Sequence, residues 1–138
     1  MKYGAVLSLL VIAAGVLSGC SQSCQNTIVR KPISTNTESF IPQRADPFIH
    51  RTAQGHYYFI ATAPEFDRIE LRSANSLPEL AKAEAKVVWR KHSSGAMGAN
   101  IWAPELHYFD NTWYIYFAAG DAEKPWLIRM YVLANRHL

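Results

Sequence analysis

The chain has 138 residues and a formal net charge of +3, from 14 Lys and Arg against 11 Asp and Glu. The basic residues are scattered among the acidic ones without forming a stripe, so the sequence does not favour a nucleic-acid partner. The two cysteines show no Cys and His spacing that suggests a zinc site.

Residues 1–19 predict a signal peptide. A positively charged start precedes an apolar stretch over residues 5–16, which is too short for a stable membrane-spanning helix. Leu17 and the small residues Ser18 and Gly19 directly precede Cys20, an arrangement that resembles the bacterial lipobox. We therefore expect lipidation of Cys20 and a lipid-anchored protein in the bacterial cell envelope, at the outer membrane or cell surface. An ordinary signal peptide with a coincidental cysteine is the alternative.

Residues 20–41 predict a flexible tether between the lipid and the folded domain. They are rich in Ser, Thr, Asn and Gln and show no apolar period. Cys24 lies in this tether, and it has no partner in the chain if Cys20 is acylated. A structural disulfide is therefore not expected.

Residues 42–138 carry one pattern twice. A carboxylate beside a proline is followed by a short strand, a tight turn and an aromatic strand, first over residues 45–61 and again over 103–117. A repeat of this size, built of strands, is typical of β-propeller blades. The strands are expected at residues 48–51, 56–62, 68–73, 85–89, 106–109, 112–118 and 127–133, with a helical turn within 77–85 and a Gly- and Ser-rich loop at 93–100.

We therefore predict an all-β fold with one blade at about 46–92 and a second, incomplete blade at about 101–138. Apolar residues over 57–60 would face both sides of their strand, which favours a sheet packed between neighbouring sheets. A closed propeller needs at least four blades. We expect this sequence to be a fragment, about the first two blades of a longer gene product.

Four side chains are candidates for a functional site. Asp46, at the start of an inner strand, is either a catalytic carboxylate or a residue that caps the strand start. Glu105 is the second carboxylate, in what looks like the equivalent place of the second copy. Trp102 either fills a gap between blades or lines a sugar site, and Phe66 is either a pocket wall or a core aromatic.

Two motifs resemble glycoside hydrolase family 43, the five-bladed propeller hydrolases of arabinose- and xylose-containing glycans. Ala45-Asp46-Pro47 is similar to the first-blade motif of this family, and Ile101-Trp102-Ala103-Pro104-Glu105 to the second-blade motif. Residues 64–72 and 89–92 look like those of members that act as α-L-arabinofuranosidases. The resemblance implies that Asp46 is the catalytic base and that Trp102 lines the substrate pocket.

The family resemblance also implies an inverting mechanism, in which a base activates water and an acid protonates the departing oxygen, with the carboxyl groups roughly 6.5–9.5 Å apart. In the family the acid and a pKa-modulating Asp come from the third and fourth blades. We therefore expect Glu105 to be a pocket or structural residue, and this chain by itself to be inactive on p-nitrophenyl arabinofuranoside. Family members often hold a structural calcium ion, so the resemblance allows one in a full-length parent, but no residue here identifies such a site and no cofactor is identified. The rival hypothesis is a non-catalytic glycan-binding surface lipoprotein.

Overall fold

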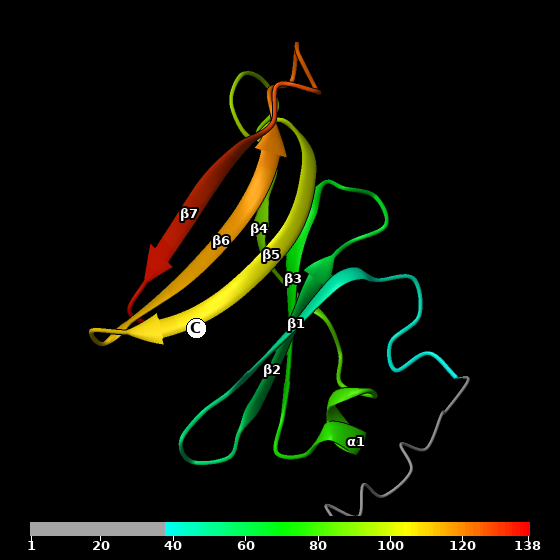
Figure 1. Ribbon diagram of the computed structural model, residues 1–138, viewed down its shortest axis with the longest axis vertical. Helices are drawn as coiled ribbons and strands as arrows, with labels where there is room; N and C mark the ends of the chain where they lie inside the picture. Colours follow the sequence, from blue (N-terminus) through cyan, green and yellow to red (C-terminus); the bar gives the residue numbers. More distant parts are fainter. Residues whose placement is uncertain (1–37) are drawn as a thin grey trace, which may run out of the picture. The chain divides into compact units, whose positions relative to one another are not determined.

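The computed structural model describes residues 38–138, which form two antiparallel sheets (Figure 1). The predicted signal peptide, Cys20 and most of the predicted tether lie outside these residues. The first sheet has the order β1-β2-β3-β4 and the second β5-β6-β7. The elements are β1 (Ala45–Arg51), β2 (Tyr57–Thr62), β3 (Arg68–Ala74), α1 (Leu77–Leu80), β4 (Lys86–Arg90), β5 (Ala99–Phe109), β6 (Thr112–Gly120) and β7 (Arg129–Asn135).

Most strands fall where the sequence predicts them, but β5 begins well before the expected start at Leu106. The Gly- and Ser-rich loop predicted over 93–100 ends in this strand, because Ala99 pairs with Gly120 across the sheet. Two bulges interrupt β5 between Ala99 and Glu105, and such irregular pairing weakens the alternation by which a strand is recognised in a sequence. The helix is also shorter than predicted, ending at Leu80.

The turn between β5 and β6 follows the predicted chemistry. Asp110 and Asn111 both adopt positive φ angles, 50° and 55°. A two-residue hairpin turn of this kind requires left-handed backbone at both positions, which Asp and Asn tolerate better than most residues.

The first sheet is covered on both faces, as the apolar run at 57–60 predicts. On one face Ile60, Ile69 and Leu71 pack against the second sheet, where the core residues are Ile101, Leu106, Ile115, Phe117 and Ala119. On the other face Phe59 and Ala61 pack against Leu80 of α1 and Ile41. In Figure 1, α1 lies beside the ends of β2 and β3, away from the second sheet. Ile41 is 6% exposed, so packed structure includes the last residue of the predicted tether.

The two sheets repeat the same strand register at their first hairpin. The equivalent pairs are Ala45↔Thr62 with Trp102↔Ala118, Phe48↔Ile60 with Glu105↔Tyr116, and Arg51↔Tyr57 with Tyr108↔Trp113. In both copies, two residues bulge out opposite one residue of the partner strand. Asp46 therefore corresponds to Ala103, and Glu105 corresponds to Phe48. The expectation that Glu105 occupies the place of Asp46 in the second copy is wrong, because the pairing aligns Pro47 with Pro104 and so places Glu105 two residues beyond the match of Asp46.

Candidate active site

Asp46 lies in the bulge at the start of β1. Asp46 and Pro47 together oppose Ala61 of β2, and Asp46 has a φ of 51°. Proline lacks an N–H group and is tolerated at such an interruption of the ladder. The bulge leaves Asp46 exposed at the end of the sheet, where its carboxylate can meet a ligand.

A single hydroxyl group joins Asp46 to the second sheet. The Thr62 hydroxyl donates to Oδ2 of Asp46 over 2.9 Å, and the backbone N–H of Ala103 donates to the same hydroxyl oxygen over 2.8 Å. Thr62 is 3% exposed and is the one fully buried polar or charged residue among residues 38–138. Its two hydrogen bonds compensate for the burial of the hydroxyl. In the sequence, Thr62 is only the last residue of a predicted strand, and no local pattern marks it as part of a site.

Phe66 and Trp102 meet, as two candidate pocket residues should. Their rings pack edge to face with centroids 5.9 Å apart, and the N–H of Ile101 donates to the carbonyl of Phe66 over 3.1 Å. Phe66 is 41% exposed, so it is not a core residue. Trp102, next to Ala103, brings this aromatic pair to the same end of the first sheet as Asp46.

Trp126 extends the aromatic surface, although the sequence alone does not indicate it as a site residue. It lies between β6 and β7, is 81% exposed, and its ring centroid is 6.0 Å from that of Trp102. The side-chain amide of Asn100 donates to the carbonyl of Pro125 over 2.8 Å and so fixes the neighbouring backbone. A lone tryptophan after a proline carries no periodic signal, and only the fold places it beside Trp102.

Glu105 belongs to a different group of side chains. It is exposed, and its carboxylate contacts Nε2 of His107 over 3.1 Å. The ring of His107 also packs on Phe48 and Tyr116. Nearby, burial and the charge of His107 lower the pKa of His50, while a backbone hydrogen bond with Leu106 acts in the opposite direction. The structure pairs Glu105 with a histidine rather than with Asp46.

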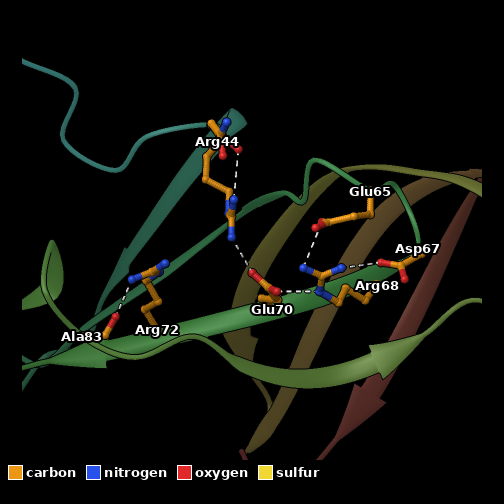
Figure 2. A network of polar contacts seen from close by, with 8 residues as sticks. Arg44, Glu65, Asp67, Arg68, Glu70, Arg72 and Ala83 are labelled. Atoms are coloured by element: carbon orange, nitrogen blue, oxygen red, sulfur yellow. Dashed lines mark hydrogen bonds and ion pairs between the residues drawn. The ribbon is translucent and has the colours of Figure 1, made fainter.

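The charged residues of β3 form an ion-pair network rather than a solvated face (Figure 2). Arg44 forms an ion pair with Glu70 over 2.7 Å. Arg68 binds Glu70 over 2.5 Å, Asp67 over 2.7 Å and Glu65 over 2.9 Å. The Glu70 side chain at the centre of these ion pairs is only 11% exposed.

Burial acts to raise the pKa of Glu70, but the hydrogen bonds and charges of Arg68 and Arg44 outweigh it and hold that pKa below its usual value. The hydrogen bonds that Arg68 donates, first to Glu70 and then to Asp67, raise the pKa of Arg68. Glu70 and Arg68 therefore both stay charged at neutral pH.

The surroundings of Asp46 are open in the described part of the chain. A hollow of about 340 Å³ includes Trp89 and Trp113 in its lining, and another of about 520 Å³ includes Arg44 and Pro47, but neither is lined by Asp46.

Within residues 38–138, no group of three or more His, Cys, Asp or Glu side chains is placed to hold a metal ion. No helix in the described part is long and apolar enough to cross a membrane.

Bulged strands, an exposed carboxylate and an aromatic surface thus lie at one end of two antiparallel sheets that share a core. The model of the glycosyl hydrolases family 43 matches residues 37–137. The chain belongs to this family, which confirms the resemblance drawn from the two motifs and the all-β propeller fold.

Two curated relatives are both named extracellular exo-α-(1→5)-L-arabinofuranosidase. The chain is 49% identical over 125 residues to the one from Streptomyces avermitilis, covering 91% of this chain and 26% of that protein. It is 56% identical over 97 residues to the one from Streptomyces chartreusis, covering 70% of this chain and 30% of that protein. The crystal structure of α-L-arabinofuranosidase from Lactobacillus brevis matches with a TM-score of 0.63 and 47% identity, over 69% of this chain and 31% of that chain. The chain thus spans between a quarter and a third of the length of these proteins.

Proposed function

We propose that residues 38–138 form the first two blades of an inverting exo-acting α-L-arabinofuranosidase in which Asp46 is the general base. The observation that carries this proposal is the exposed carboxylate of Asp46, held in a bulge beside an aromatic surface, in a chain about half identical to relatives named as arabinofuranosidases. We call a protein that carries these residues together with the remaining blades the complete propeller. Arabinofuranosyl or xylosyl oligosaccharides are its proposed substrates.

In the proposed reaction, Asp46 removes a proton from a water molecule as the water oxygen attacks the anomeric carbon. The bond between that carbon and the glycosidic oxygen breaks, and a carboxylic acid from another blade gives its proton to the departing oxygen. Because water enters on the face opposite to the departing group, the configuration is inverted. The Thr62 hydroxyl holds the carboxylate of Asp46 in place through its hydrogen bond to Oδ2.

The aromatic residues are proposed to hold the sugar. Phe66 and Trp102 present rings at right angles to each other, which provides both a flat face and an edge for a sugar ring. Glu105 is proposed as a pocket residue acting through His107, which it contacts. Lipidation at Cys20 and a flexible tether remain proposals for the preceding segment, in keeping with relatives named as extracellular.

The decisive experiment compares two Asp to Asn changes in the complete propeller. Asp46→Asn is expected to lower kcat on p-nitrophenyl α-L-arabinofuranoside by about 10²–10⁴-fold with little change in KM, because the amide cannot accept the proton. Asp110→Asn, in the exposed turn between β5 and β6, is the matched control and should keep the parent rate.

A parent-like kcat for Asp46→Asn would exclude Asp46 as the base. A complete propeller that binds arabino-oligosaccharides by calorimetry but shows no turnover would instead support the glycan-binding alternative.

A further inference from the structure

Thr62 connects the proposed base to a backbone group of the second sheet. Its hydroxyl has one proton to donate and lone pairs to accept with. Because the N–H of Ala103 already donates to the hydroxyl oxygen over 2.8 Å, the hydroxyl proton is free to point at Oδ2 of Asp46, 2.9 Å away. The Ala103 contact therefore fixes both the position and the orientation of the donor that Asp46 receives.

The second copy of the repeat is an internal comparison without these polar groups. Ala103 takes the place of Asp46, and Ala118 takes the place of Thr62. Both copies nevertheless form the same bulge, and the residue before the proline has a positive φ in both, 51° at Asp46 and 46° at Ala103. The backbone arrangement therefore does not require the threonine hydroxyl, and the hydroxyl is present in the copy that has the carboxylate.

We infer that Thr62 is a positioning residue for the reaction, which holds the Asp46 carboxylate through Oδ2 and leaves Oδ1 to bind and deprotonate the attacking water. This inference rests on the proposed function of Asp46 as the base. The geometry also makes the position of the base depend on how the two sheets pack, since Ala103 belongs to β5 while Thr62 and Asp46 belong to the first sheet.

The test uses variants of the complete propeller. Thr62→Val keeps the size of the side chain and removes the donor, and kcat should fall about tenfold or more with KM nearly unchanged, as expected for loss of a hydrogen bond to a charged group. Thr62→Ser restores the hydroxyl and should recover most of the rate. Thr62→Ala copies the residue found at the equivalent position of the second sheet and provides a second variant if Thr62→Val folds poorly.

Thr52→Val is the matched control for stability. The Thr52 hydroxyl accepts a hydrogen bond from the N–H of His56 over 3.1 Å, the same kind of contact that Thr62 makes with Ala103, but in the turn between β1 and β2. Thr52→Val should lower the melting temperature and leave kcat unchanged. A Thr62 variant should instead have a lower kcat even under conditions where it is fully folded.

A double variant shows whether Thr62 acts through Asp46. In an Asp46→Asn background, Thr62→Val should lower kcat no further, because the carboxylate it serves is gone. If Thr62→Val lowers kcat in the Asp46→Asn background by the same factor as in the parent, the inference is overturned. It is also overturned if folded Thr62→Val and Thr62→Ala keep a parent-like kcat. Either result would leave Asp46 as the base. Parent-like kcat for Asp46→Asn would instead overturn the proposed function itself.

Discussion

The residue before each repeated proline adopts a left-handed backbone conformation. Such a conformation costs about 1–3 kcal/mol for a residue other than glycine and persists only where the surroundings enforce it. Asp46 and Ala103 both adopt it, each within a bulge. Because the alanine copy carries no reactive group, the conformation belongs to the scaffold. The proposed chemistry at Asp46 depends on two side chains, those of Asp46 and Thr62, that this scaffold carries in the first copy.

The aromatic pair at the site should contribute mainly to sugar binding. Trp102→Ala in the complete propeller is expected to raise KM for an arabino-oligosaccharide about tenfold, because it removes a large apolar face from the bound state, with a smaller effect on kcat. Trp102→Phe should retain much of the affinity. Phe109→Ala, which changes an exposed aromatic residue at the far end of β5, is the control and should leave KM unchanged. A KM unaffected by Trp102→Ala would assign Trp102 to packing between the sheets.

At the scale of single elements, β3 shows how a strand with charged residues on one face can be buried on that face. Arg68, Glu70 and Arg72 alternate along the strand, and Arg44 from the segment before β1 reaches Glu70 (Figure 2). Arg72 donates to the carbonyl of Ala83, beyond α1. The network ties the start of β1, and so the backbone next to Asp46, to the middle of the sheet.

Removing the charge of Glu70 should weaken this tie. Glu70→Gln is expected to lower the free energy of unfolding by about 1–3 kcal/mol at neutral pH, because two arginines lose a shared partner in a half-buried site. The folded pKa of Glu70 lies below its unfolded value of about 4.5, so its contribution is fully present above that pH and is lost as pH falls through the folded pKa.

The measurement is chemical denaturation at several pH values. Between neutral pH and pH values below 4.5, the free energy of unfolding should fall more steeply for the unsubstituted protein than for Glu70→Gln. Glu84→Gln changes an exposed carboxylate between α1 and β4 and serves as the control. Equal pH dependence in the parent and Glu70→Gln would show that the ion pairs add nothing to stability.

For the folded unit as a whole, the main feature is an apolar sheet face without a covering layer among residues 38–138. On β7, Met130 is 70% exposed and Val132 is 50% exposed, and they pair with Ala118 and Tyr116 of β6. In the proposed propeller this face packs against the next blade. Without that blade, exposed apolar strands favour association with other copies.

The chain by itself is therefore expected to self-associate. The double change Met130→Lys and Val132→Lys should increase the monomer fraction measured by size-exclusion chromatography with light scattering, whereas Gln54→Lys, in an exposed turn, adds one charge elsewhere and should not. In the complete propeller the same double change should lower the melting temperature. A parent chain that is monomeric at high concentration and melts sharply and reversibly would indicate a self-sufficient small domain instead.

The sequence by itself determined the repeat, nearly all strand positions, the turn at Asp110 and Asn111, and the family, because these depend on local residue patterns and short motifs. It also singled out Asp46, Phe66 and Trp102, which lie in or beside those motifs. The tertiary structure established through its strand pairing that Asp46 matches Ala103 rather than Glu105, in agreement with the alignment of Pro47 with Pro104. It alone brought Thr62 to Ala103, Glu70 to Arg44 and Trp126 to Trp102, because these contacts join residues from separate elements whose approach is fixed by the packing of the sheets.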